Sequence, residues 1–119
     1  PHEAFVPYLR EQAMAVVIID ALWNGVFQST KIASMAYAHQ LHVAPHNYYG
    51  HLATFMNAHL AAAIPNLRIM ETDIDRIPWD DDLFTATPEY RDGKLQLPRE
   101  PGWGCEPDEA ALERHPPDE

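Results

Sequence analysis

Cysteine, basic residues and long apolar runs are all scarce in this sequence of 119 residues. The one cysteine, Cys105, excludes an internal disulfide and argues against a Cys-rich zinc site. Eight Lys and Arg stand against 18 Asp and Glu, and this net charge of -10 argues against a nucleic-acid partner, because phosphate contacts need cations. No apolar run approaches the roughly 20 residues of a membrane span, and no signal-peptide pattern opens the chain. We therefore expect a cytoplasmic protein that binds neither nucleic acid nor membrane.

The residues that are present fall into two unlike parts. A hydrophobic fraction of 46% is enough for the core of one domain. Residues 1–71 are apolar and almost neutral, whereas residues 72–119 hold 14 of the 18 acidic residues and seven of the 11 prolines. We interpret the acidic part as mostly solvated surface, and we expect a boundary between the two parts at residues 71 and 72.

The first part alternates between strand-like and helical patterns, which predicts an α/β fold. Continuous apolar runs rich in β-branched residues are typical of strands buried on both faces, and apolar residues three and four apart indicate helices. Short connections between alternating elements imply parallel strands with helical crossovers. The expected order is a helix over 5–15, a strand over 16–19, a loop through 23–25, a helix over 27–40, a strand over 41–44 stopped by Pro45, a helix over 52–64 and a strand over 67–70.

The second part has weaker patterns. Asp92 and Gly93 lie between two extended segments within residues 89–97, which predicts a hairpin. Residues 107–113 predict a short helix with acidic residues in its first turn. Residues 77–87 show no sustained period, and Pro78 and Pro88 lie at either end of this segment.

Three polar residues follow the three expected strands at a regular interval. Asp20, His46 and Glu71 are 26 and 25 residues apart, and each lies at or just past the end of a strand. Because the carboxyl ends of parallel strands share one edge, we expect these side chains to converge. An imidazole held by a carboxylate is a suitable general base near neutral pH. The alternatives are local: Asp20 caps the next turn, His46 is satisfied by backbone, and Glu71 is solvated.

Several motifs in this setting resemble the end of the barrel domain of the enolase superfamily, in particular the mandelate racemase subgroup and its sugar-acid dehydratases. These motifs are Ile18-Ile19-Asp20, Trp23-Asn24-Gly25, Val43-Ala44-Pro45-His46-Asn47, Ile69-Met70-Glu71 and Pro101-Gly102-Trp103-Gly104. The resemblance implies that residues 1–71 are a partial barrel, strands six to eight of a (β/α) TIM-type barrel with their crossover helices. Residues 72–119 would be the C-terminal extension that returns to a capping domain.

The resemblance also implies a reaction and the residues that perform it. His46 matches the general base, Asp20 its dyad partner, and Glu71 the acid after the eighth strand. Such enzymes abstract the proton α to a substrate carboxylate, Mg²⁺ stabilises the enediolate, and dehydratases then eliminate water. We therefore expect part of an acid-sugar dehydratase acting on a small carboxylate substrate. The residues expected to contact that substrate are Trp23, Asn24, Asn47 and Tyr48.

The family's Mg²⁺ ligands and capping domain have no counterpart in these 119 residues. We expect the ligands on the missing part of the barrel, in the same or another chain, and we expect this chain alone to be inactive. A three-stranded piece leaves strand edges open, so association with that remainder and a homo-oligomer are expected. The alternatives are a racemase or cycloisomerase of the same superfamily, or a non-catalytic fragment or assembly subunit.

Overall fold

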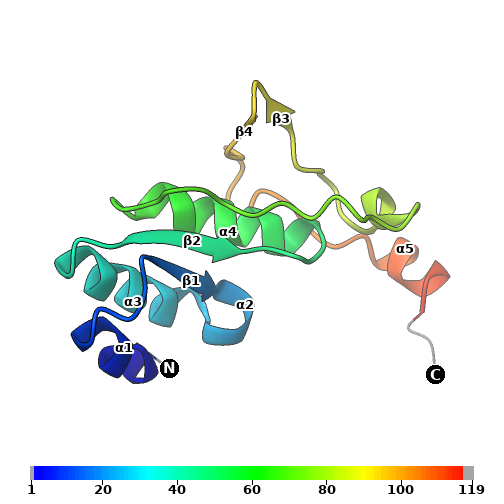
Figure 1. Ribbon diagram of the computed structural model, residues 1–119. Coiled ribbons are helices and arrows are strands. Elements are labelled where there is room, and N and C mark those ends of the chain that lie inside the picture. The colour runs from blue at the N-terminus through cyan, green and yellow to red at the C-terminus, as the bar shows by residue number, and fades with distance from the viewer. Residues whose placement is uncertain (1, 117–119) are drawn as a thin grey trace.

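The computed structural model describes residues 2–116, and its centre is a pair of parallel strands. These are β1, Val16–Asp20, and β2, His42–His46, which pair residue by residue from Val16 opposite His42 to Asp20 opposite His46 (Figure 1). The remaining elements are η1 (His2–Phe5), α1 (Val6–Arg10), α2 (Ala21–Asn24), α3 (Val26–Ala38), α4 (His51–Ala63), η2 (Asp80–Leu83), β3 (Tyr90–Arg91), β4 (Lys94–Leu95) and α5 (Glu109–Arg114).

The third expected strand is present only as an extended segment beside β2. Leu67 forms a single parallel bridge with Val43. Val43 N–H donates to Asn66 O at 2.9 Å, and Arg68 N–H donates to Val43 O at 2.9 Å. The next donor on that side of β2 would belong to Pro45, which has no N–H. The ladder is therefore interrupted, although Glu71 N–H still reaches Pro45 O at 3.3 Å.

The two faces of β1 and β2 have opposite environments. Val17, Ile19 and Val43 are buried in a core with residues of α1, α3 and α4, so these helices cover one face. Ile18 points to the other face and is 65% exposed. The expectation that this strand is buried on both faces is wrong for this chain, because no helix within residues 2–116 covers the second face. Strand periodicity places Asp20 and His46 on that open face, in line with Ile18 and Ala44.

Three expected boundaries differ from those of the structure, each for a local reason. The first helix ends at Arg10, because Gln12 adopts a left-handed φ of 50°. The expected loop at 23–25 overlaps the short helix α2, which begins at Ala21 and ends at Asn24. Asp20 caps this helix by accepting hydrogen bonds from the backbone of its first turn. The strand predicted to stop at Pro45 continues through it to His46, because the missing N–H is lost only on the side of the irregular third segment.

The C-terminal part follows its predicted pattern more closely. The hairpin forms, with Asp92 and Gly93 at φ of 52° and 70° in its turn. The short helix forms as α5, capped by Asp108. Figure 1 shows the β3–β4 hairpin projecting away from the strands, and α5 beside η2 at the end of the molecule remote from α1. Within the described part of the chain, no helix has the length and apolar character required to cross a membrane.

Candidate active site

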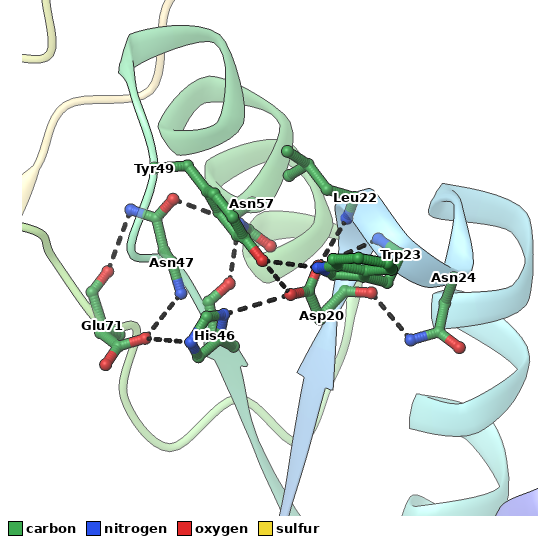
Figure 2. Close-up of polar contacts among 9 residues, drawn as sticks. All are labelled: Asp20, Leu22, Trp23, Asn24, His46, Asn47, Tyr49, Asn57 and Glu71. Carbon is green, nitrogen blue, oxygen red and sulfur yellow. Dashed lines mark hydrogen bonds and ion pairs between the residues drawn. The ribbon is translucent and has the colours of Figure 1, made fainter.

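The strand register brings Asp20 and His46 together at the carboxyl ends of β1 and β2. His46 Nδ1 lies 3.2 Å from Asp20 Oδ2, an ion-pair distance without the alignment of a hydrogen bond. The side chains of His46 and Asp20 are 38% and 19% exposed, so the pair is reachable from the open face. Figure 2 shows the imidazole between the carboxylates of Asp20 and Glu71.

Asp20 uses both of its carboxylate oxygens. Oδ1 accepts hydrogen bonds from the backbone N–H groups of Leu22 at 2.9 Å and Trp23 at 3.0 Å. Oδ2 accepts one from the Tyr49 hydroxyl at 2.6 Å. Partial burial raises the pKa of Asp20, but the Tyr49 bond, the two backbone bonds and the nearby His46 together bring that pKa below its ordinary value. Asp20 therefore both caps α2 and presents an ionised oxygen to His46.

Glu71 approaches the opposite nitrogen of the imidazole. Its Oε2 lies 3.6 Å from His46 Nε2 and accepts a 2.8 Å hydrogen bond from the backbone N–H of Asn47. Asn57 donates to the His46 carbonyl at 3.1 Å, which ties the end of β2 to α4. The structure thus brings all three strand-end residues together, as the spacing predicts, and an imidazolium at His46 would lie between two carboxylates.

The four residues expected to contact a substrate differ in what their side chains already bind. Trp23 is 82% exposed and Tyr48 51% exposed, so both present aromatic surface to solvent. The Tyr48 hydroxyl donates to Asp75 at 2.6 Å. The Asn24 amide donates to Asp20 O at 2.8 Å. Asn47 is fully buried, and its amide donates to Thr54 at 3.0 Å and to the Glu71 carbonyl at 3.2 Å.

Tyr49 also belongs to the site, although the pattern of strand ends does not point to it directly. Its hydroxyl contacts Asp20 and accepts a 2.8 Å hydrogen bond from the Trp23 indole. A signal for it exists, because Trp23 and Tyr49 are 26 residues apart, the interval that separates Asp20 from His46. Both residues stand three positions after a strand end, so the interval that pairs Asp20 with His46 also pairs Trp23 with Tyr49.

The open face forms a shallow floor next to the dyad. A hollow of about 280 Å³ is lined by His46, Glu71 and the apolar side chains beside them. Those apolar residues are Ile18, Ala44, Pro45, Ile69 and Met70. Among residues 2–116, no group of three His, Cys, Asp or Glu side chains is arranged to hold a metal ion. The site thus places an imidazole between two carboxylates above an apolar floor.

Comparison with known proteins finds similar sequences and shapes within longer chains. Residues 2–111 match the enolase C-terminal domain-like family. A Burkholderia xenovorans LB400 protein with the provisional name L-alanine-DL-glutamate epimerase, in a crystal structure with magnesium and fumarate, is 57% identical with a TM-score of 0.95. That match covers 98% of this chain and 29% of the Burkholderia chain.

Two further relatives extend this comparison. An enolase of the mandelate racemase subgroup from Agrobacterium tumefaciens is 35% identical with a TM-score of 0.85, covering 95% of this chain and 30% of that one. The D-xylonate dehydratase of Haloferax volcanii is 32% identical over 108 residues, which are 90% of this chain and 26% of the dehydratase. The chain therefore spans less than a third of the length of each of these relatives.

Proposed function

Because the chain belongs to the enolase C-terminal domain-like family, we propose that it supplies the base side of the active site of a Mg²⁺-dependent acid-sugar dehydratase. In this proposal β1, β2 and the segment 67–70 are strands six to eight of the barrel, and residues 72–119 form the extension toward a capping domain. The observation that carries it is His46 held between Asp20 and Glu71 on a face that no other element of the described chain covers.

His46 is the proposed general base. With Asp20 facing Nδ1 at 3.2 Å, the ring proton belongs on Nδ1 and the lone pair on Nε2. Nε2 then takes the proton from the carbon α to the substrate carboxylate, and the electron pair of that C–H bond forms the enediolate. In dehydration the electron pair of the enediolate then expels the β-hydroxyl, which takes the proton held by the His46 imidazolium and departs as water. Asp20 stays ionised and balances the charge of the imidazolium, and Glu71 hydrogen-bonds the substrate.

The metal ligands lie outside this chain in the proposal. The residues described here do not fit a Mg²⁺ site, so none of the steps above is assigned to the ion. When bound by the remainder of the barrel, Mg²⁺ would supply positive charge to the substrate carboxylate. The magnesium in the Burkholderia structure is consistent with this division.

The apolar floor and the exposed aromatic rings support a small carboxylate substrate lying on the open face. Trp23 presents its ring beside the dyad, and we propose that it covers the substrate, with Tyr48 as a second contact. In this proposal Asn24 and Asn47 lie beside the substrate without donating to it through their amides. Those amides already donate to the backbone carbonyls of Asp20 and Glu71.

Epimerisation is the second candidate reaction, and one comparison favours it. The Burkholderia relative, at 57% identity, is named as an epimerase. Both reactions begin with the same proton abstraction, so His46 keeps its role in either. They differ in the group that returns a proton or expels the hydroxyl, and the residues of this chain do not distinguish between them.

A chimaera tests the proposal directly. Residues 2–116 replace the matching 29% of the Burkholderia protein, and purified chimaera is incubated in D₂O with Mg²⁺ and a panel of acids that includes D-xylonate and L-Ala-L-Glu. We expect deuterium at the α-carbon, detected by NMR. A dehydrated keto acid identifies the dehydratase, and inverted substrate identifies the epimerase.

The variant His46→Asn should abolish this exchange, whereas His39→Asn, an exposed histidine at the end of α3, should retain it. Exchange at the wild-type rate in His46→Asn would contradict the assignment of the base. A folded chimaera that exchanges no acid of the panel would contradict the proposed function.

A further inference from the structure

Tyr49 makes two contacts with the Asp20–His46 pair and a third with Trp23. Its hydroxyl lies 2.6 Å from Asp20 Oδ2 and 2.8 Å from Trp23 Nε1. Its ring meets the His46 ring edge-on, with centroids 5.5 Å apart and planes at 75° (Figure 2). One side chain therefore contacts both members of the proposed dyad.

The chemistry of the partners fixes the direction of these hydrogen bonds. An indole N–H can only donate and an ionised carboxylate can only accept. The Tyr49 oxygen therefore accepts from Trp23, and its hydroxyl hydrogen points to Asp20. Donation into a hydroxyl oxygen makes that hydroxyl a better donor, so Trp23 strengthens the bond that Tyr49 makes.

The two oxygens of Asp20 are anchored from different directions. Oδ1 is held by the backbone of α2, and such main-chain bonds fix only one corner of the carboxylate. Oδ2 faces His46, and among the described residues Tyr49 is the one other group that holds it. The hydrogen bond to Asp20 raises the pKa of Tyr49, so the hydroxyl keeps its proton.

We propose that Tyr49, whose hydroxyl accepts a hydrogen bond from Trp23, is a positioning residue that fixes the Asp20 oxygen facing His46. This inference rests on the proposed role of His46 as base. Tyr49 touches neither the transferred proton nor the metal, and it acts by setting the plane and keeping the charge of Asp20. Without its hydroxyl the carboxylate can turn about the bond to Cβ, and the imidazole loses its fixed partner.

The first test needs no activity, so it separates this inference from the proposed function. Carboxyl carbons of the isotopically labelled chimaera are followed by NMR as pH falls. The groups that face Asp20 are Tyr49, His46 and, beyond the ring, Glu71. We expect Tyr49→Phe to move the titration of Asp20 upward, toward its ordinary range, and Trp23→Phe to move it less in the same direction.

The matched control is Tyr48→Phe. It also removes a tyrosine hydroxyl that bonds a carboxylate at 2.6 Å, but that carboxylate is Asp75. Tyr48→Phe should leave the titration of Asp20 in place. An Asp20 titration that is the same in Tyr49→Phe and wild type, with folding verified by amide spectra, would overturn the inference whatever the chimaera catalyses.

The second test uses the chimaera. A hydrogen bond to a charged group corresponds to about a tenfold to hundredfold change in rate, so Tyr49→Phe should lower kcat by about that factor while KM stays within about twofold. Loss of activity through a raised KM alone would show that Tyr49 binds substrate and would reject the positioning role.

Discussion

At the scale of single residues, Asp20 shows how a local and a long-range role combine. The sequence leaves open whether this residue caps a turn or orients a histidine. In the structure Oδ1 does the first and Oδ2 faces His46. The two interpretations are compatible because a carboxylate has two oxygens that accept hydrogen bonds independently.

Substitutions at Asp20 should separate these two roles. Asp20→Ala removes the cap and should lower the free energy of unfolding by about 1 kcal/mol, whereas Asp20→Asn keeps a capping oxygen and should cost less. In the chimaera, Asp20→Asn should still reduce deuterium exchange by a large factor; the corresponding orienting Asp of serine proteases contributes about 10⁴-fold. Urea unfolding and exchange rates measure the two effects. Equal stability losses in both variants would show that the cap is not the basis of the effect.

The pH dependence of stability should follow from the lowered pKa of Asp20. An acid whose pKa is lower in the folded state stabilises the fold above its unfolded pKa, near 3.9 for Asp, and loses that contribution as pH falls through the folded value. The stability advantage of wild type over Asp20→Asn should therefore be constant above about pH 5 and shrink on acidification. Urea midpoints between pH 6 and pH 3 measure it. An advantage that grows toward pH 3 would contradict the sign.

At the scale of elements, a polar cluster around the buried His51 joins the start of α4 to the C-terminal part. His51, in the first turn of α4, is 1% exposed. Its Nε2 lies 2.6 Å from Asp81 Oδ1, and Arg76 donates to its Nδ1. Arg76 also bonds Asp80 at 3.2 Å. Arg can only donate and an ionised carboxylate can only accept, so the imidazole lies between a donor and an acceptor.

Removing His51 should loosen this junction. In His51→Ala the buried ring is lost from its packed site, and the partly exposed Arg76 and the exposed Asp81 lose a partner. We expect the free energy of unfolding to fall by about 2 kcal/mol, most of it from the lost packing of the ring. His39→Ala, at an exposed site, should stay within about 0.5 kcal/mol of wild type. Urea unfolding at one protein concentration, followed by tryptophan fluorescence, compares them. Similar midpoints for the two variants would mean that the cluster contributes little.

The elements also show what the sequence can and cannot predict. The sequence predicts both ends of α3 and of α4 to within two residues, because the apolar spacing of these helices is sustained over several turns. The hairpin was predicted from Asp92 and Gly93, whose φ values require such residues. The first helix was predicted too long, because nothing in the pattern reveals the left-handed Gln12. The exposure of Ile18 depends on what covers the strands, which local spacing does not encode.

The candidate site divides in the same way. Convergence of Asp20, His46 and Glu71 was predictable, since it follows from parallel strands and a regular interval. The Tyr49 contact was not predicted, because it depends on how the loop after β2 turns back over the strand ends. The chemical roles of all these residues stay predictions until the chimaera is assayed.

At the scale of the whole molecule, the chain is more extended than its length requires. Its Cα radius of gyration is 15.8 Å, above the roughly 13.5 Å of a compact domain of 119 residues. The projecting hairpin lengthens the molecule (Figure 1), and the second face of β1 and β2 is left uncovered. Ile18 and Ile69 are each 65% exposed on that face, which is unusual for a soluble monomer.

The isolated chain should therefore associate through this face. Sedimentation velocity over a concentration series should show oligomers or aggregates, and Ile18→Asp should shift the distribution toward monomer. Ile74→Asp, at a site 83% exposed but outside the apolar floor, should not. A wild-type chain that sediments as a compact monomer and unfolds cooperatively would contradict the expectation that this face needs a partner.

The paired spacing of Asp20 with His46 and of Trp23 with Tyr49 has a consequence for inheritance. A genetic crossover within α3 would take positions 20 and 23 from one parent and positions 46 and 49 from the other. A substitution that removes the Tyr49 hydroxyl also removes the acceptor of the Trp23 indole N–H. Selection to retain Trp23 then weakens together with selection to retain Tyr49. Substitutions at 23 and 49 should then arise as pairs in descent, while Asp20, tied to its own helix by backbone bonds, persists through either change.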